Sequence, residues 1–236
     1  MDYRIENLYK SYGQLEVLGG LSMELEQGRV SVLLGPSGCG KTTLLNILSG
    51  LDKDYHGSIG QLAGMRSSYV FQEDRLLPWR SAVENVAMVL HEHAEKAQAL
   101  VLAQKALALV GLSDSASLKP SAMSGGMKRR VALARAFAYP SDMLLLDEPF
   151  SSLDIKTRIS VMDLFLSLRE DDGRTAIVVT HDVREAIYLA DRIFTLSDKP
   201  AVLKSCTNVS LGRQERAYAS ATAASLEAQL YQLLLE

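Results

Sequence analysis

Short apolar runs alternate along the chain with longer stretches in which apolar residues recur at helical spacing. The runs are continuously apolar, which is typical of strands buried on both faces of a parallel sheet. We predict such strands at residues 29–34, 68–71, 142–146, 175–179, 193–197 and 201–205. Helices are predicted at residues 43–50, 155–169, 183–190 and 221–235. This alternation predicts an α/β core with a mainly parallel sheet.

Two stretches depart from the alternation. Residues 81–137 are mainly helical, and this stretch is too long for an ordinary crossover between parallel strands, so we expect an inserted helical lobe. Residues 3–8 and 15–26 are predicted to be strands of a small antiparallel sheet. We expect one domain over 1–236, with residues 1–73 and 140–236 in the core and 74–139 in the helical subdomain.

Composition narrows the class of protein. The net charge of -3 and pI near 5.9 argue against a general nucleic-acid binder, which is usually basic. No apolar run reaches the roughly 18–20 residues that cross a bilayer, and the first residues lack the apolar segment of a signal peptide. The two cysteines, Cys39 and Cys206, do not suggest a disulfide framework. We therefore expect a cytoplasmic protein.

A glycine-rich segment follows the predicted strand at residues 29–34. It matches the phosphate-binding pattern G-x-x-x-x-G-K-[ST] and comprises Gly35, Pro36, Ser37, Gly38, Cys39, Gly40, Lys41 and Thr42, followed by Thr43. Glycines allow backbone N–H groups to face a phosphate, and the following helix start adds positive potential. The Lys41 ammonium would pair with the outer phosphates, and the Thr42 hydroxyl would ligate Mg²⁺. A plain glycine-rich turn is the simpler alternative.

Two acids end the predicted strand at residues 142–146. In α/β sheets the carboxyl ends of strands form the ligand-binding edge, so Asp147 is predicted to hold Mg²⁺. Glu148 is predicted to be the general base that polarises the attacking water. The alternative is a strand that runs out into solvent, where acids are common.

A second helix start lies in the helical stretch. Ser124 is a good N-cap, and Gly125 and Gly126 leave the helix start bare for an anion. Residues at helical spacing after them, among them Met127 and Val131, are expected to face the lobe interior. By itself this pattern is often only a cap.

With these motifs in one order, the sequence resembles the ABC ATPase family over nearly its whole length. The resemblance implies that Tyr12 stacks on adenine and that Gln72 senses Mg²⁺ and the γ-phosphate. Residues 124–127 resemble the family signature, residues 151–154 resemble the loop that follows the carboxylates, and His181 resembles the switch histidine. The implied site binds ATP and Mg²⁺, with Glu148, His181 and Gln72 catalytic and with Thr42, Gln72 and Asp147 at the metal.

The resemblance also implies partners. Two copies would meet head to tail, so that the phosphate loop of one and Ser124 of the other enclose ATP, with Asp154 supporting the interface. Residues 71–79 and Met127 resemble the subfamily that serves nitrate, sulfonate and taurine importers, which couple to a membrane permease and usually to an external solute-binding protein. Such a subunit is peripheral on the inner face of the membrane. The sequence departs from the commonest pattern at Met123 and Met127.

Residues 74–79 are the predicted docking surface for a permease helix. Trp79 could instead anchor the core of the helical lobe. Residues 128–130, Lys-Arg-Arg, are interpreted as a solvated helix face and not as a nucleic-acid site. The transported solute and the role of the segment after Asp198 cannot be read from the sequence.

Three other functions compete with the transporter interpretation. An ABC-type ATPase that acts on DNA or ribosomes would usually carry long insertions or basic extensions, which the sequence does not show. A nucleotide-binding regulatory module without turnover would not need Glu148 or His181. A small-molecule kinase gives no reason for residues 124–127 or for His181.

Overall fold

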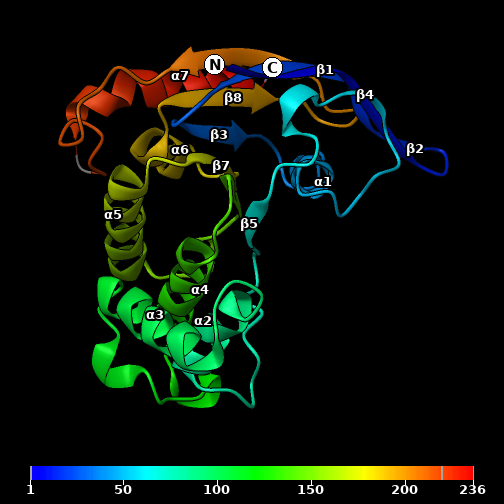
Figure 1. Cartoon of the computed structure of the whole chain (residues 1–236). Coiled ribbons are helices and arrows are strands. Elements are labelled where there is room, and N and C mark those ends of the chain that lie inside the picture. The colour runs from blue at the N-terminus through cyan, green and yellow to red at the C-terminus, as the bar shows by residue number, and fades with distance from the viewer. Residues whose placement is uncertain (1, 219, 236) are drawn as a thin grey trace.

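The larger sheet of the computed structural model, which describes residues 2–218 and 220–235, has the strand order β5-β6-β7-β3-β8-β9 (Figure 1). All neighbouring strands are parallel except β8 and β9. The strands are β3 Val30–Leu34, β5 Ser67–Val70, β6 Met143–Asp147, β7 Thr175–Thr180, β8 Arg192–Leu196 and β9 Leu203–Asn208. The predicted mainly parallel sheet is confirmed. The last strand begins later than predicted because Ala201 forms only an isolated bridge, to Leu18.

A smaller antiparallel sheet with the strand order β2-β1-β4 lies beside the larger one. Its strands are β1 Asp2–Tyr12, β2 Leu15–Glu26 and β4 His56–Ser58. Strand β1 is longer than predicted because its pairing with β2 continues to Tyr12 and Leu15 at the hairpin turn. Gly57 is required where β4 approaches β1, since a Cβ there would lie 2.2 Å from the Asn7 carbonyl oxygen.

The helices divide between the sheet and a separate lobe. Helix α1 (Lys41–Leu48), α5 (Ile155–Asp172), α6 (Val183–Leu189) and α7 (Ala224–Leu235) lie around the sheet. Helices α2 (Ala82–Ala87), α3 (Lys96–Leu109) and α4 (Gly125–Ala138) form the predicted helical lobe, at the bottom of Figure 1. Short 3-10 turns occur at Gly60–Leu62, Met88–Leu90, Ser113–Ser115, Pro120–Ala122 and Ala221–Ala223. Among the described residues, no helix combines the length and apolarity that a membrane span requires.

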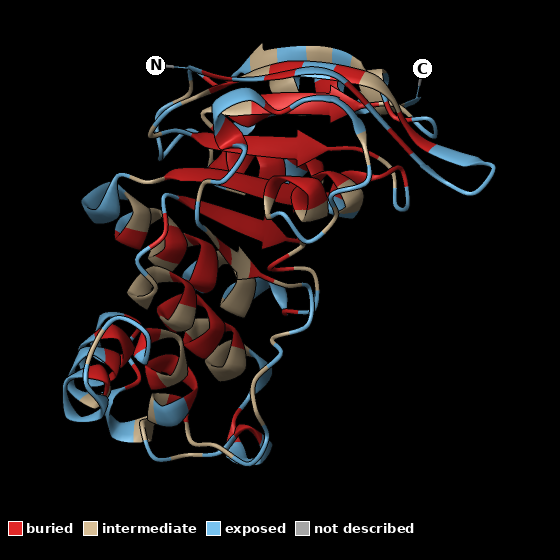
Figure 2. Cartoon of the chain, turned by 45° about the vertical axis from the view of Figure 1, so that its right-hand side comes forward, coloured by how far each residue is buried: buried red, intermediate tan, exposed pale blue. Residues whose placement is uncertain are grey.

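Helix α4 packs against two hydrophobic cores at once. Val131 and Ala134 belong to the core of the helical lobe. Ala132, Leu133 and Ala136, on another side of the helix, belong to the core formed by the sheet with α5 and α6. Figure 2 shows buried residues on α4 as well as along the central strands. The lobe is therefore joined to the sheet through α4.

The structure corrects two interpretations in this region. Arg129 does not lie on a solvated face, because it is 1% exposed and its guanidinium bonds to backbone carbonyls of the loop after β5. The run of charged residues at 128–130 indicated a polar segment, but it did not show that Arg129 bonds to backbone carbonyls. Trp79 does not anchor the lobe core, because it is 67% exposed. The predicted helical spacing from Met127 onward is confirmed, since Met127 and Val131 both pack in the lobe.

Phe165 on α5 is fully buried and links three elements. Its ring lies 6.2 Å from that of Phe137 on α4 and 6.4 Å from that of Phe150, which follows β6. We predict that Phe165→Ala lowers the free energy of unfolding by about 3–5 kcal/mol, because it removes apolar burial and leaves a cavity. Urea unfolding followed by circular dichroism measures the change. The control Ile155→Ala, at a 61% exposed position of the same helix, should change stability by less than about 0.5 kcal/mol; equal losses in both variants would contradict the prediction.

Candidate functional site

The predicted site residues follow strands that are neighbours in the larger sheet. The glycine-rich loop follows β3, His181 follows β7, and Asp147 with Glu148 ends β6. The order β6-β7-β3 places these three carboxyl ends side by side at one edge of the sheet. The loop that contains Gln72 follows β5, the next strand along. The parallel pairing therefore brings together residues that are far apart in the sequence.

The glycine-rich loop is shaped to expose backbone donors. Gly40 is the N-cap of α1 with φ 125°, and no side chain caps the helix start. A Cβ at Gly40 would lie 2.9 Å from Cγ1 of Val17, so only glycine fits there. Gly38 also has positive φ, and a Cβ on it would meet nothing within 4 Å. This open, uncapped helix start is the anion-binding geometry that the sequence predicted.

Lys41 places its charge inside the loop. It is 4% exposed, and Nζ donates hydrogen bonds of 2.7 Å to the carbonyl oxygens of Gly35 and Pro36. The buried Cys39 thiol lies 4.0 Å from the same ammonium, and burial raises the pKa of that thiol. The loop thus concentrates positive charge and backbone N–H groups at one point. Ser37, Gly38 and Thr42 are exposed and Thr43 is half-buried.

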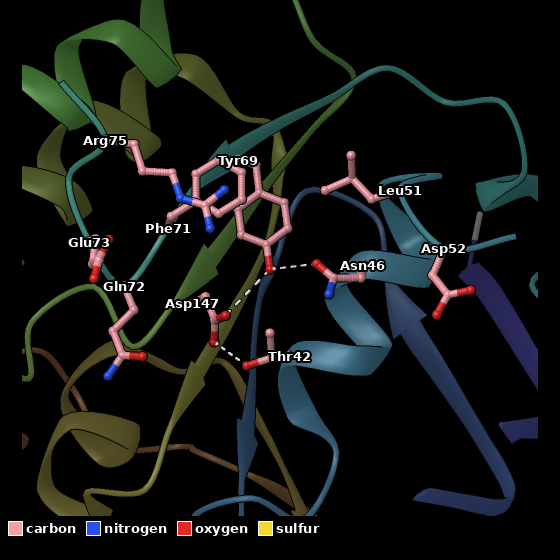
Figure 3. Close-up of a pocket in the computed structure, with 10 residues that line it drawn as sticks. All are labelled: Thr42, Asn46, Leu51, Asp52, Tyr69, Phe71, Gln72, Glu73, Arg75 and Asp147. Carbon is pink, nitrogen blue, oxygen red and sulfur yellow. Dashed lines mark hydrogen bonds between the residues drawn. The ribbon is translucent and has the colours of Figure 1, made fainter. Parts of the chain in front are cut away.

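Thr42 and Asp147 form the candidate magnesium site. The Thr42 hydroxyl donates to Oδ1 of Asp147 over 3.1 Å, and Tyr69 donates to Oδ2 over 3.4 Å (Figure 3). Burial raises the pKa of the Asp147 carboxyl, and the bond from Thr42 opposes that rise. No group of three or more His, Cys, Asp or Glu residues that could hold a metal occurs among the residues described. A hydroxyl and one carboxylate are oxygen donors that suit Mg²⁺, and water and phosphate oxygens would supply its other ligands.

Glu148 and His181 contact each other. Nδ1 of His181 lies 3.1 Å from Oε2 of Glu148, and the histidine side chain is 47% exposed. Glu148 has φ 41°, a left-handed conformation that is uncommon for a residue with a side chain. The backbone N–H of Glu148 donates to the Val179 carbonyl on β7, and the backbone carbonyl of Glu148 accepts from the Ser151 hydroxyl. The strained backbone is therefore held from both sides and directs the carboxylate toward His181.

Gln72 is exposed and lines a cavity of about 590 Å³ together with Thr42 and Asp147. Its side chain can thus approach the candidate magnesium site (Figure 3). Tyr12 is not among the residues that line this cavity. It is half exposed, and its hydroxyl donates to Asp52 over 2.8 Å. The adenine-stacking role of Tyr12 stays a prediction.

Two helix starts lie next to each other on the surface. Ser124 is exposed and its hydroxyl accepts from the Met127 N–H over 3.2 Å at the start of α4. Asp154 is exposed and accepts from the Thr157 N–H over 3.1 Å at the start of α5. A Cβ at Gly126 would lie 2.6 Å from Cγ2 of Thr157, so glycine permits this close approach. Ser124 is thus accessible to a neighbouring molecule.

Sequence reasoning missed several residues of the site. Tyr69 bonds to both Asn46 and Asp147, and Asp52 bonds to Tyr12. Tyr69 follows Ser68 on the edge strand β5, and the apolar run alone gave no sign that its hydroxyl reaches β6. Asn46 and Asp52 had no motif to mark them.

Comparison with known proteins shows the family of the chain. Residues 18–151 match the family described as ABC transporter. The chain belongs to the ABC transporter family. It is the ATP-hydrolysing subunit of such a transporter, and the resemblance found in the sequence is confirmed.

Individual relatives of this ABC ATPase cover most of its length. It is 41% identical over 203 residues to the aliphatic sulfonates import ATP-binding protein SsuB 1 of Pseudomonas syringae pv. syringae, covering 86% of this chain and 83% of the relative. It is 42% identical over 205 residues to the taurine import ATP-binding protein TauB of Escherichia coli, covering 84% and 80%.

Solved structures agree with the fold. The dimeric structure of MJ0796, a bacterial ABC transporter cassette, superposes with a TM-score of 0.77 at 29% identity, covering 90% of this chain and all of that one. A post-hydrolysis dimer of the same cassette bound to ADP and Pi gives a TM-score of 0.76 at 30% identity with the same coverage. The P-loop NTPase core with its antiparallel and helical parts is thereby confirmed for this ABC ATPase.

The contact between Gly126 and Thr157 gives a prediction about stability. Gly126→Ala should lower the free energy of unfolding by about 1–3 kcal/mol, because the new Cβ forces α4 and α5 apart. Gly125→Ala is the matched control, since a Cβ there meets only Leu153, at an ordinary 3.9 Å. That control should change stability by no more than about 0.5 kcal/mol in urea unfolding.

Removing the obstructing methyl group should rescue the variant. Thr157→Ser deletes Cγ2 and keeps the hydroxyl, so Gly126→Ala combined with Thr157→Ser should recover most of the lost stability. A double-mutant cycle measures this coupling. Additive losses in the cycle would show that the steric contact is not the cause.

Proposed function

We propose that this chain is the ATP-binding subunit of an importer for small sulfonates, a class that includes taurine. The identity of 41–42% to the sulfonate and taurine import ATP-binding proteins over more than four fifths of the chain carries this proposal. The ATPase does not touch the solute, so the solute is assigned through these relatives and not through a pocket in the chain.

ATP would lie with its phosphates over the loop from Gly35 to Thr42. The loop N–H groups and the start of α1 would bind the β- and γ-phosphates. Lys41 would release its carbonyl partners and pair with the outer phosphates, since its ammonium already lies at the loop centre. Thr42 and Asp147 would hold Mg²⁺, and Gln72, which lines the same cavity, could approach it. Bound Mg²⁺ supplies charge neutralisation on the phosphate oxygens.

Glu148 would act on the attacking water. Oε2 of Glu148 lies 3.1 Å from Nδ1 of His181, so the histidine would orient the base. The same histidine would also contact the γ-phosphate. A positioned base of this kind usually contributes about 10²–10⁴ in rate.

A second copy would complete each nucleotide site. Ser124, Gly125 and Asp154 are exposed at neighbouring helix starts, so another subunit could reach them. Helix-terminus donors from one copy would cover the γ-phosphate bound by the other. The similar cassette MJ0796 is dimeric, which supports a dimer here.

The permease would dock beside the Gln72 loop. Trp79 is 67% exposed, and it lines a cavity of about 430 Å³ with Arg80 and Glu84. On the other side of the loop, Phe71 and Arg75 line both the 590 Å³ cavity and a neighbouring one of about 320 Å³. An exposed aromatic next to hollows suits insertion of a partner helix. Through this permease the chain would be held at the inner face of the membrane, with an external solute-binding protein delivering the solute.

Glu148→Gln tests the assignment of the base. Turnover should fall by about 10²–10⁴ while ATP still binds, because the amide keeps the shape but cannot accept the proton. Phosphate release measures turnover, and gel filtration with Mg-ATP should show a persistent dimer. The control Glu170→Gln, at an exposed position of α5, should leave turnover unchanged. Unchanged turnover in Glu148→Gln would mean that another group is the base.

Reconstitution tests the transporter assignment. With its permease and solute-binding protein in vesicles, ATPase activity should rise when taurine or an aliphatic sulfonate is present and should not rise with sulfate alone. Uptake of the labelled sulfonate should depend on ATP on the side that carries this chain. Stimulation by DNA or ribosomes without any response to the permease would favour a soluble ABC-type ATPase instead.

A further inference from the structure

Two arginines of α4 hold the backbone of the Gln72 loop. Nη1 and Nη2 of Arg129 donate to the carbonyl oxygens of Phe71 and Gln72, at 2.8 and 2.6 Å. Arg135 donates to the carbonyls of Asp74 and Arg75, each at 2.9 Å. Four of the five consecutive carbonyls in residues 71–75 are thus bonded to one helix.

Arg129 has no access to solvent that could replace these bonds. It is 1% exposed, and its Nε lies 3.1 Å from Oδ1 of Asp74, an ion pair whose alignment is not that of a hydrogen bond. Burial lowers the pKa of Arg129 and raises the pKa of the Asp74 carboxyl, so both charges are desolvated. A buried ion pair adds little net stability compared with apolar packing. Its effect here is to fix where the loop lies.

Other contacts hold the loop as well. Arg75 has φ 44°, and its guanidinium lies 3.7 Å from the centre of the Phe71 ring. Phe71 stacks on Tyr69 with ring centres 4.1 Å apart, and Tyr69 reaches Asp147 (Figure 3). A left-handed residue with a side chain persists only where its surroundings hold it, as Arg135 does through the Arg75 carbonyl.

Helix α4 also begins at the family signature, residues 124–127, with Ser124 as its N-cap. Arg129 follows Ser124 by five residues, which is about 7–8 Å along a helix axis. A single hydrogen-bonded helix transmits displacement over that length with little bending. In the proposed dimer, Gln72 serves the nucleotide bound by its own subunit, whereas Ser124 serves the nucleotide bound by the partner.

We propose that Arg129 is a positioning residue that fixes the Gln72 loop to α4, so that docking of Ser124 on one nucleotide moves Gln72 at the other. The inference rests on the proposed roles of Gln72 and Ser124 and adds a physical connection between them. It makes hydrolysis at the two sites of the dimer cooperative.

The test compares three variants of the full chain. Arg129→Met removes the donors, and Arg129→Lys keeps the charge but cannot serve two carbonyls in a fixed fork. Arg130→Met is the matched control, because Arg130 is the next residue of α4 and bonds to Val110 and Ser160, away from the loop. For each variant the ATPase rate is measured against ATP concentration, which gives kcat, KM and the Hill coefficient.

Arg129→Met should lower kcat about tenfold, with KM for ATP changed less than about twofold. Its Hill coefficient for ATP should fall toward one. Arg129→Lys should give intermediate values, and Arg130→Met should match the unaltered protein in kcat and Hill coefficient. Equal effects in Arg129→Met and Arg130→Met, or an unchanged Hill coefficient in Arg129→Met, would overturn the inference.

A second comparison separates this inference from the proposed function. Gln72→Ala alone should lower kcat, and adding Arg129→Met to it should lower kcat little further, because both changes remove one function. Multiplicative losses would overturn the inference and leave the role of Gln72 in place. Full turnover in Gln72→Ala would instead overturn the proposed role of Gln72, and the inference with it.

Discussion

The parallel pairing of β7 with both β3 and β6 is the constraint on which the site depends. It fixes the end of β3, where the phosphate loop begins, next to the ends that carry His181 and Asp147. Every strand residue of these pairs is buried, so the register is set by the apolar run on each strand and not by the site residues. Because the framework is apolar, the polar residues at its edge can be held in strained or desolvated states.

Two charged residues of the site are buried at this edge of the sheet. Lys41 and Asp147 are both buried, and a few fixed partners replace the water that each has lost. Two carbonyls accept from the ammonium, and the hydroxyls of Thr42 and Tyr69 donate to the carboxylate. A bound nucleotide with Mg²⁺ would offer each group an opposite charge in place of these weak partners. The gain is large because the surroundings have a low dielectric constant. Binding therefore exchanges partners at the site without rebuilding the fold.

The sequence was most informative where the chemistry is local. Lys41 and Thr42 could be assigned because a phosphate loop is made by consecutive residues whose backbone does the binding. Glu148 was assigned from its place at the end of an apolar strand, whereas His181 was assigned through the family resemblance, because the contact between the two depends on strand order. Tyr69 could not be foreseen, because its role depends on which strand lies next to β5. Arg129 was misread because a carbonyl partner leaves no mark in the sequence, and a charge run is typical of an exposed face.

Helix α4 contacts more parts of the molecule than any single motif in the sequence suggested. Its apolar residues are divided between the lobe core and the sheet core, its first turn touches α5 through Gly126, and its arginines hold the loop after β5. A helix held by apolar packing on several sides can tilt or shift as a unit more easily than it can bend, because bending would break its own hydrogen bonds. Ser124 and the two arginines that bond to the Gln72 loop therefore belong to one stiff element. The hydrogen bonds from the arginines fix the loop at particular carbonyls, because hydrogen bonds depend on direction and apolar contacts do not. Apolar packing thus holds helix α4 in place, and buried Arg129 attaches the loop to it. Such an arrangement suits a subunit that passes the effect of nucleotide binding to a partner.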